Sequence, residues 1–282
     1  MDMSKSLWDT RSMADQPTLA RRALGLAFTR LRIKRHMTPA QVGAAIGVSR
    51  QTIGRIEEGS QATHILKAQA LCDFFEVSPE EKSRLCDLAT RGNEKGWWEP
   101  YFDKGRGTAA APKTPLFLET ERSAIRTWGI ETEVIPGPLQ TLEFLRELQA
   151  AGLPILEDDA AAAQGLRAHR QKSNDERPDN PEMELIIGQA AIYYLNQLRD
   201  EVRDGQWARI REMAARPNVT IRVLNRLHAA TANSFTILTP ADELPPFVYL
   251  DAVDGCRYIE DPDVVSLYER TFVAARESTE II

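Results

Sequence analysis

The sequence predicts two domains of different classes, an all-α domain of five helices followed by an α+β domain with a mainly antiparallel sheet. Apolar residues recur at the helical period between about residues 19 and 90, whereas short runs of β-branched and aromatic residues dominate beyond residue 183. With 282 residues, 43% of them apolar, the chain is long enough for two hydrophobic cores. We expect a flexible N-terminal tail at 1–18, the helical domain at 19–92, a junction and loop at 93–115, and the α+β domain at 116–282.

Three of the five helices carry clear local signals. The first is expected at about Leu19 to Arg35, the fourth at His64 to Phe75, and the fifth after Ser78, which precedes a proline and two glutamates. Apolar side chains at helical spacing supply the core candidates of the first and fourth helices: Leu24, Ala27, Phe28, Leu31, Leu66, Leu71, Phe74 and Phe75.

The segment from Thr38 to Gly59 is typical of two short helices joined by a sharp turn. Gly47 supplies the turn, because glycine adopts a positive φ at little cost. Thr38 and the proline after it start the first helix, Ser49 caps the second, and Gly59 can end the second in the left-handed conformation. The residues expected to face a shared core are Val42, Ala45, Ile46, Val48, Ile53 and Ile56. This spacing indicates a helix-turn-helix.

The outward face of the second short helix suits nucleic acid. The residues left outside the core are Arg50, Gln51, Thr52, Gly54 and Arg55, whose side chains include groups that bind base edges and phosphates. A basic cluster ends the first helix: Arg30, Arg32, Lys34 and Arg35. This cluster fits either contact with the DNA backbone or a solvated face stabilised by the helix dipole, and the two roles are compatible.

The second domain changes period along its length. We expect loop at 103–115, an amphipathic helix from Leu116 to Trp128, and a helix near 139–148. A loop at 152–164 would lead into a helix through Arg170, and further helices are expected at 190–199, 207–215 and 262–276. Strands are predicted at 184–187, 218–224, 234–238, 247–250 and 256–260. The last three strands are expected to be antiparallel neighbours. The final helix would cover the sheet through Val265, Leu267, Tyr268 and Phe272.

The net charge of −6 hides an asymmetry along the chain. Residues 1–60 carry ten Lys or Arg against five Asp or Glu, whereas residues 61–282 carry 25 against 36. A basic segment attracts phosphate and an acidic remainder is repelled by it. The pattern favours an N-terminal DNA-binding domain that is attached to a domain with another function.

Several classes of protein are disfavoured. No run approaches the roughly 20 apolar residues that cross a bilayer, and the N-terminus has no apolar core of the signal-peptide kind, so we expect a cytoplasmic protein without a membrane partner. Cys72, Cys86 and Cys256 are odd in number and lack ligand spacing, so we expect buried, reduced thiols, no metal and no cofactor. The four histidines are His36, His64, His169 and His228, and no pair of them has the spacing of a catalytic triad or a metal site. An enzyme is not expected.

Residues 19–75 resemble the Xre, or Cro and cI-like, helix-turn-helix family, through the ungapped match GVSRQTIGRIEEG. The resemblance implies this fold, DNA binding, and base reading by Arg50, Gln51 and Arg55. Pro39 replaces a glutamine that contacts phosphate in many members, so Gln41 or Thr38 would substitute for it. The full set expected at the DNA backbone is Lys34, Arg35, Thr38, Gln41, Ser49, Thr52 and Ser60.

Residues 93–282 resemble the effector domain of antitoxin-like transcriptional regulators of actinobacteria. The motifs that carry the resemblance are Gly96-Trp-Trp98, Glu119-Thr-Glu121, 134–141, 216–224, 234–238 and 247–250. This resemblance implies a small partner protein encoded nearby. Pro138 stands where the family pattern has leucine, and the region after Leu227 has few of the expected glycines.

The aromatic residues Trp97, Trp98, Tyr101 and Trp128 admit two interpretations. They could form a patch that binds a ligand or partner, or they could be buried in an interdomain core. Large aromatic side chains are commonly buried, and we favour the core.

Together these patterns predict a sequence-specific transcriptional regulator. It would bind a double-stranded operator as a homodimer, with half-sites about 34 Å apart. Its C-terminal domain would bind a small partner protein or a ligand. The alternative is an antitoxin-like interaction module that sequesters a neighbouring small protein and autoregulates its operon. A third and weaker hypothesis is an enzyme in residues 93–282, but this part of the sequence shows no recognisable set of catalytic residues.

Overall fold

The computed structural model divides the chain into two compact units, Met1–Trp97 and Trp98–Ile282. The structure describes residues 18–94, 96–101, 114–152, 157–241, 244–252 and 255–282. The expected flexible tail and most of the expected loop at 103–115 lie outside the described residues. The first part is the helical unit and the second is the α+β unit.

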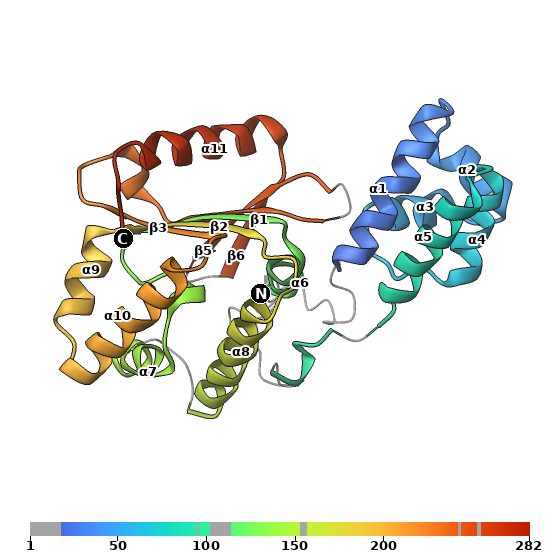
Figure 1. The fold of residues 1–282 in the computed structure, drawn as a ribbon. Helices are drawn as coiled ribbons and strands as arrows, with labels where there is room; N and C mark the ends of the chain where they lie inside the picture. Colours follow the sequence, from blue (N-terminus) through green and yellow to red (C-terminus); the bar gives the residue numbers. More distant parts are fainter. Residues whose placement is uncertain (1–17, 95, 102–113, 153–156, 242–243, 253–254) are drawn as a thin grey trace, which may run out of the picture. The chain divides into compact units, whose positions relative to one another are not determined.

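The helical unit contains the five predicted helices. Figure 1 shows them as α1 (Leu19–Lys34), α2 (Pro39–Ile46), α3 (Arg50–Glu57), α4 (Ile65–Phe74) and α5 (Pro79–Arg91). Hydroxyl groups cap the predicted N-termini of α2, α3 and α5. Thr38 accepts a hydrogen bond from the backbone N–H of Gln41, Ser49 from that of Thr52, and Ser78 from that of Glu81. These bonds satisfy backbone donors that have no partner within the helix.

The turn between α2 and α3 depends on two glycines. Gly47 ends α2 with a φ of 72°, as its position in the sequence predicts. Gly43 lies so close to the returning chain that an added Cβ would be 2.6 Å from the carbonyl oxygen of Val48. Gly59 follows α3 with a φ of 68°. The helix-turn-helix is therefore present as predicted.

The core of the helical unit is nearly as predicted, with two errors. Leu24, Phe28, Val42, Ile53, Ile56, Leu71 and Phe75 are all buried. Ala45 is exposed, because the returning chain packs on Gly43 and so the buried face of α2 is narrow. Leu66 is 66% exposed, because α4 turns Ala68, Leu71 and Cys72 inward and Leu66 lies outside that stripe.

The α+β unit is built on one seven-stranded sheet with the order β6-β5-β4-β1-β2-β3-β7. β1, β2 and β3 are parallel neighbours, and the other four pairings are antiparallel, so the sheet is mainly antiparallel as predicted. The strands are β1 (Arg126–Glu131), β2 (Glu182–Gly188), β3 (Val219–Leu224), β4 (Phe235–Thr239), β5 (Phe247–Ala252), β6 (Gly255–Ile259) and β7 (Glu280–Ile281).

Helices cover both faces of this sheet (Figure 1). α11 (Pro262–Arg276) packs on one face through Val265 and Phe272, as predicted, although Leu267 is 54% exposed. A second core cluster on the other face joins Leu185 and Ile221 of the sheet to the helices. The helices on that face are α7 (Leu142–Ala150), α8 (Glu157–Asp175), α9 (Gln189–Asn196) and α10 (Asp200–Ala214).

One predicted element of the α+β unit is wrong in type. The helix expected from Leu116 to Trp128 ends early, as α6 (Thr114–Ser123), and Trp128 lies in β1. β1 is a central strand that pairs with both β2 and β4. Such pairing outweighs local helical spacing, because it satisfies the backbone on both sides of the strand. The loop expected at 152–164 is also wrong in part, since α8 begins at Glu157. The two-residue edge strand β7 is absent from the prediction.

Candidate nucleic-acid interface

α3 presents the predicted base-reading face to solvent. Ile53 and Ile56 are each 2% exposed and fix the helix on the core, whereas Arg50, Gln51 and Arg55 are exposed. Within the described ranges, these three side chains form no hydrogen bond or ion pair, and their donors remain available for a ligand. An open hollow on this surface is lined by residues of α1, α2 and α3 and by the residue after α3: Thr29, Pro39, Arg50, Gln51, Gly54, Arg55, Glu57 and Glu58.

An ion pair fixes the orientation of α3 on α1. Arg32 donates to both carboxylate oxygens of Glu57, at 2.6 and 2.8 Å, and also to the carbonyl oxygen of Met37 at 3.0 Å. The hydrogen bond to Glu57 raises the pKa of Arg32. Glu57 is 11% exposed and its charge is neutralised, so this carboxylate does not repel phosphate at the exposed face. Glu57 therefore has a structural role, in which it holds α3 on α1 through Arg32.

Most residues predicted to contact the DNA backbone also cap helices. Thr38 and Gln41 form a reciprocal capping box at α2. The hydroxyl groups of Ser49 and Thr52 lie 2.9 Å apart at the start of α3. Ser60 donates to the carbonyl oxygen of Arg55 at 3.3 Å, just past the end of α3. These groups are thus held in place at the ends of α2 and α3.

The structure separates the two basic residues predicted at the end of α1. Lys34 is exposed. Arg35 instead binds the end of α4, where it donates to the carbonyl oxygens of Phe74 and Phe75 at 3.2 and 2.7 Å and pairs with Glu76 at 3.2 Å. Arg35 therefore has an internal role that the sequence prediction missed, because residues 74–76 are distant in the chain.

The four aromatic residues considered for a ligand patch do not form one site. The Tyr101 hydroxyl lies 3.4 Å from Nδ1 of His169 on α8. Trp128 stacks on Phe272 of α11, with ring centroids 4.9 Å apart. Because α8 and α11 cover opposite faces of the sheet (Figure 1), Tyr101 and Trp128 are separated by it. Trp98 is 5% exposed, and Trp97 is half-buried at the end of the helical unit.

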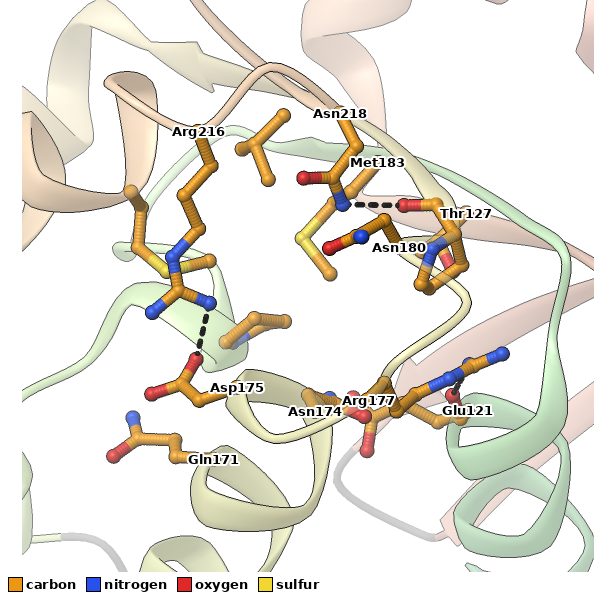
Figure 2. Close-up of a pocket in the computed structure, with 14 residues that line it drawn as sticks. Glu121, Thr127, Gln171, Asn174, Asp175, Arg177, Asn180, Met183, Arg216 and Asn218 are labelled. Atoms are coloured by element: carbon orange, nitrogen blue, oxygen red, sulfur yellow. Dashed lines mark hydrogen bonds and ion pairs between the residues drawn. The ribbon is translucent and has the colours of Figure 1, made fainter.

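The α+β unit has a polar pocket between α8 and the first residues of β1, β2 and β3. In Figure 2, Arg216 and Asp175 face Asn180 and Asn218 across it. Arg216 donates to Asp175 at 2.9 Å, and Glu121 accepts two hydrogen bonds from Arg170. These contacts neutralise the charges of the two carboxylates that line the pocket. The pocket also lies at the amino end of the parallel strands, whereas α/β sheets commonly bind ligands at the carboxyl end.

The described residues offer little for metal or thiol chemistry. Among them, no group of three or more His, Cys, Asp and Glu is placed to hold a metal ion. Cys72, Cys86 and Cys256 are free thiols, and burial raises the pKa of Cys72 to about 12. Cys72 and Cys256 are buried as expected, and Cys86 is half-buried. The buried Cys72 thiol is protonated at neutral pH and is a poor nucleophile.

Comparison with known families assigns both units. Residues 114–279 match the model described as a domain of unknown function, DUF5753, over more than half of the chain. The chain belongs to the DUF5753 family. In this DUF5753 protein, residues 29–82 match a helix-turn-helix model that covers α2, α3 and α4 and parts of α1 and α5. No curated protein and no solved structure matches the chain. In the described part of the chain, no helix is long and apolar enough to span a bilayer.

The helix-turn-helix match and the exposed face of α3 support a DNA-binding transcriptional regulator. The DUF5753 match gives the α+β unit a family and leaves its function open.

Proposed function

We propose that this DUF5753 protein is a sequence-specific transcriptional regulator that reads its operator with α3. The observation that carries the proposal is the set of three exposed side chains, Arg50, Gln51 and Arg55, without an internal partner among the described residues, on a helix fixed by its cap and its core. Arginine suits the O6 and N7 atoms of guanine, and glutamine suits adenine. Lys34 and the capped ends of α2 and α3 supply contacts to phosphates.

The proposed assembly on DNA is a homodimer. A helix-turn-helix dimer places its two recognition helices in successive major grooves, about 34 Å apart, and so reads a two-fold symmetric site. One α3 reads only a few base pairs, which is too short a site for a specific operator, and this supports two copies per site.

The direct test is selection of the full chain on duplexes with a randomised centre. We expect an enriched motif with two-fold symmetry and an affinity at least about 10³-fold higher than for scrambled duplex at the same salt concentration. A selected pool without a shared motif would contradict the proposal. Sedimentation of the complex with the selected duplex then distinguishes one bound chain from two.

The α+β unit is proposed to regulate DNA binding, by binding a small partner protein or a ligand. Its support is the architecture, in which a separate unit with two core clusters accompanies the DNA-binding unit. Co-expression with the product of an adjacent gene tests the partner. Binding that changes operator affinity by about 5-fold or more would support it. No co-purification and no change in affinity would remove the partner from the proposal.

A further inference from the structure

Gly54 is a half-buried glycine in the middle of α3, on the side of the helix that carries Arg50 and Gln51. A glycine within a helix costs about 1 kcal/mol relative to alanine, because the unfolded chain loses more backbone freedom on folding. A helix of only eight residues has few hydrogen bonds to offset that cost. A glycine at this position therefore calls for a physical reason.

Packing within the helical unit explains other glycines of this unit and leaves Gly54 unexplained. An added Cβ at Gly25 would be 2.4 Å from the carbonyl oxygen of Glu57, and one at Gly43 would be 2.6 Å from that of Val48. Those residues permit close approach of α1 to α3 and of α2 to the turn. A Cβ at Gly54 would meet no atom within 4 Å, and its φ is not in the left-handed region. The folded chain itself does not require glycine here.

The position of Gly54 around the helix places it at the centre of the DNA-facing surface. With about 100° of rotation per residue, Gly54 lies about 40° from Arg50 and about 60° from Gln51, between the two. Gly54 also lines the open hollow together with Arg50, Gln51 and Arg55. The exposed face therefore has long polar side chains around a point where the backbone is bare.

We propose that Gly54 is the point of closest approach between α3 and a base-pair edge in the major groove. The inference rests on the proposed function and specifies how α3 sits in the groove. A methyl group at residue 54 would hold the helix roughly 1 Å or more farther from the bases. Hydrogen bonds from Arg50 and Gln51 need donor–acceptor distances of about 2.7–3.2 Å, so such a displacement would weaken them.

The test compares Gly54→Ala with a matched control in the full chain. Gly205 lies on α10, is exposed, and likewise has no atom within 4 Å of an added Cβ. Both substitutions should raise the Tm by a few degrees, because alanine is the better helix former at each site. Only Gly54→Ala should weaken binding to the selected operator, by at least about 10-fold, while affinity for scrambled duplex stays within about 2-fold.

The outcomes separate this inference from the proposed function. Unchanged operator affinity in Gly54→Ala would overturn the close approach. Equal losses of affinity for operator and scrambled duplex would overturn the inference that Gly54 approaches a base-pair edge. Gly54 would then lie against the sugar-phosphate backbone. A lowered Tm would show that the fold itself needs glycine at 54. Failure of the wild-type chain to select any operator would instead overturn the proposed function, and the inference with it.

Discussion

Arg32 is the residue whose side chain joins three parts of the helical unit. It binds Glu57 of α3 through two hydrogen bonds and the carbonyl oxygen of Met37 ahead of α2. We predict that Arg32→Ala lowers the free energy of unfolding by about 2–4 kcal/mol, because it leaves the largely buried Glu57 carboxylate without its cation. Urea unfolding of the full chain, followed by far-UV circular dichroism, measures the change.

Arg91→Ala is the control for that substitution. Arg91 pairs with Asp87 at 3.6 Å, and both side chains are about half exposed. An exposed pair of this kind contributes less than about 1 kcal/mol. Equal effects of the two substitutions would contradict the structural role assigned to Arg32.

Glu131, at the end of β1, should make stability depend on pH. Burial, and the nearby charge of Asp251, raise its pKa from 4.5 to about 7, although Ser234 donates a hydrogen bond to it and Arg167 lies near. The folded state then binds more protons than the unfolded state between pH 4.5 and 7. The contribution of Glu131 to stability therefore falls as pH rises through this window, by up to about 3 kcal/mol.

Glu131→Gln isolates this contribution, because the amide does not titrate. Urea unfolding at pH 5 and pH 8 should show the variant gaining stability relative to wild type as pH rises. Parallel pH dependence of the two proteins would show that the Glu131 carboxyl is not perturbed.

At the scale of single helices, the cap of α3 serves both stability and DNA binding. Ser49 accepts from the backbone of Thr52 at 3.1 Å, and Ser78 accepts from Glu81 at 3.2 Å at the start of α5. Ser49→Ala and Ser78→Ala should each cost about 1 kcal/mol of stability. Only Ser49→Ala should also reduce operator affinity, by about 3-fold or more, because Arg50 and Gln51 occupy the turn that it caps. Equal operator affinity of both variants in a fluorescence titration would contradict this.

The helices of the helical unit were predictable because their signals are local. Threonine and serine caps, the glycine at 47 and helical spacing all lie within a few residues of the structure that they determine. β1 was not predictable in this way. Trp128 follows Thr120 and Ala124 at intervals of four, which continues a helical stripe, and only pairing with the distant β2 and β4 makes the segment a strand.

The same distinction applies to the candidate site. Arg50, Gln51 and Arg55 were predicted as exposed residues from the spacing of Ile53 and Ile56, and the structure places them so. The binding of Arg35 to the end of α4 was missed, since it joins residues about 40 positions apart. The pocket in Figure 2 was also missed, because it assembles side chains from α8 and three strand ends.

At the scale of the whole molecule, the uneven charge should appear in the salt dependence of DNA binding. Residues 1–60 carry ten basic against five acidic residues, and the remainder is acidic. Lys34 is exposed, so Lys34→Ala should weaken operator and scrambled duplex alike and reduce the slope of log K against log salt by about 1 per bound chain. Lys172 on α8 is exposed in the other unit, and Lys172→Ala should leave the slope unchanged. Equal slopes for both variants would exclude Lys34 from the interface.

The proposed function depends on base reading by α3. The most direct measurement is the ratio of dissociation constants for scrambled and selected duplexes, determined for the wild-type chain and for Arg50→Ala at one salt concentration. We expect the substitution to cost about 1–3 kcal/mol on the selected duplex, to lower the ratio by roughly 5- to 150-fold and to relax the preference at one base position. An unchanged ratio, with equal losses on both duplexes, would show that Arg50 does not read a base.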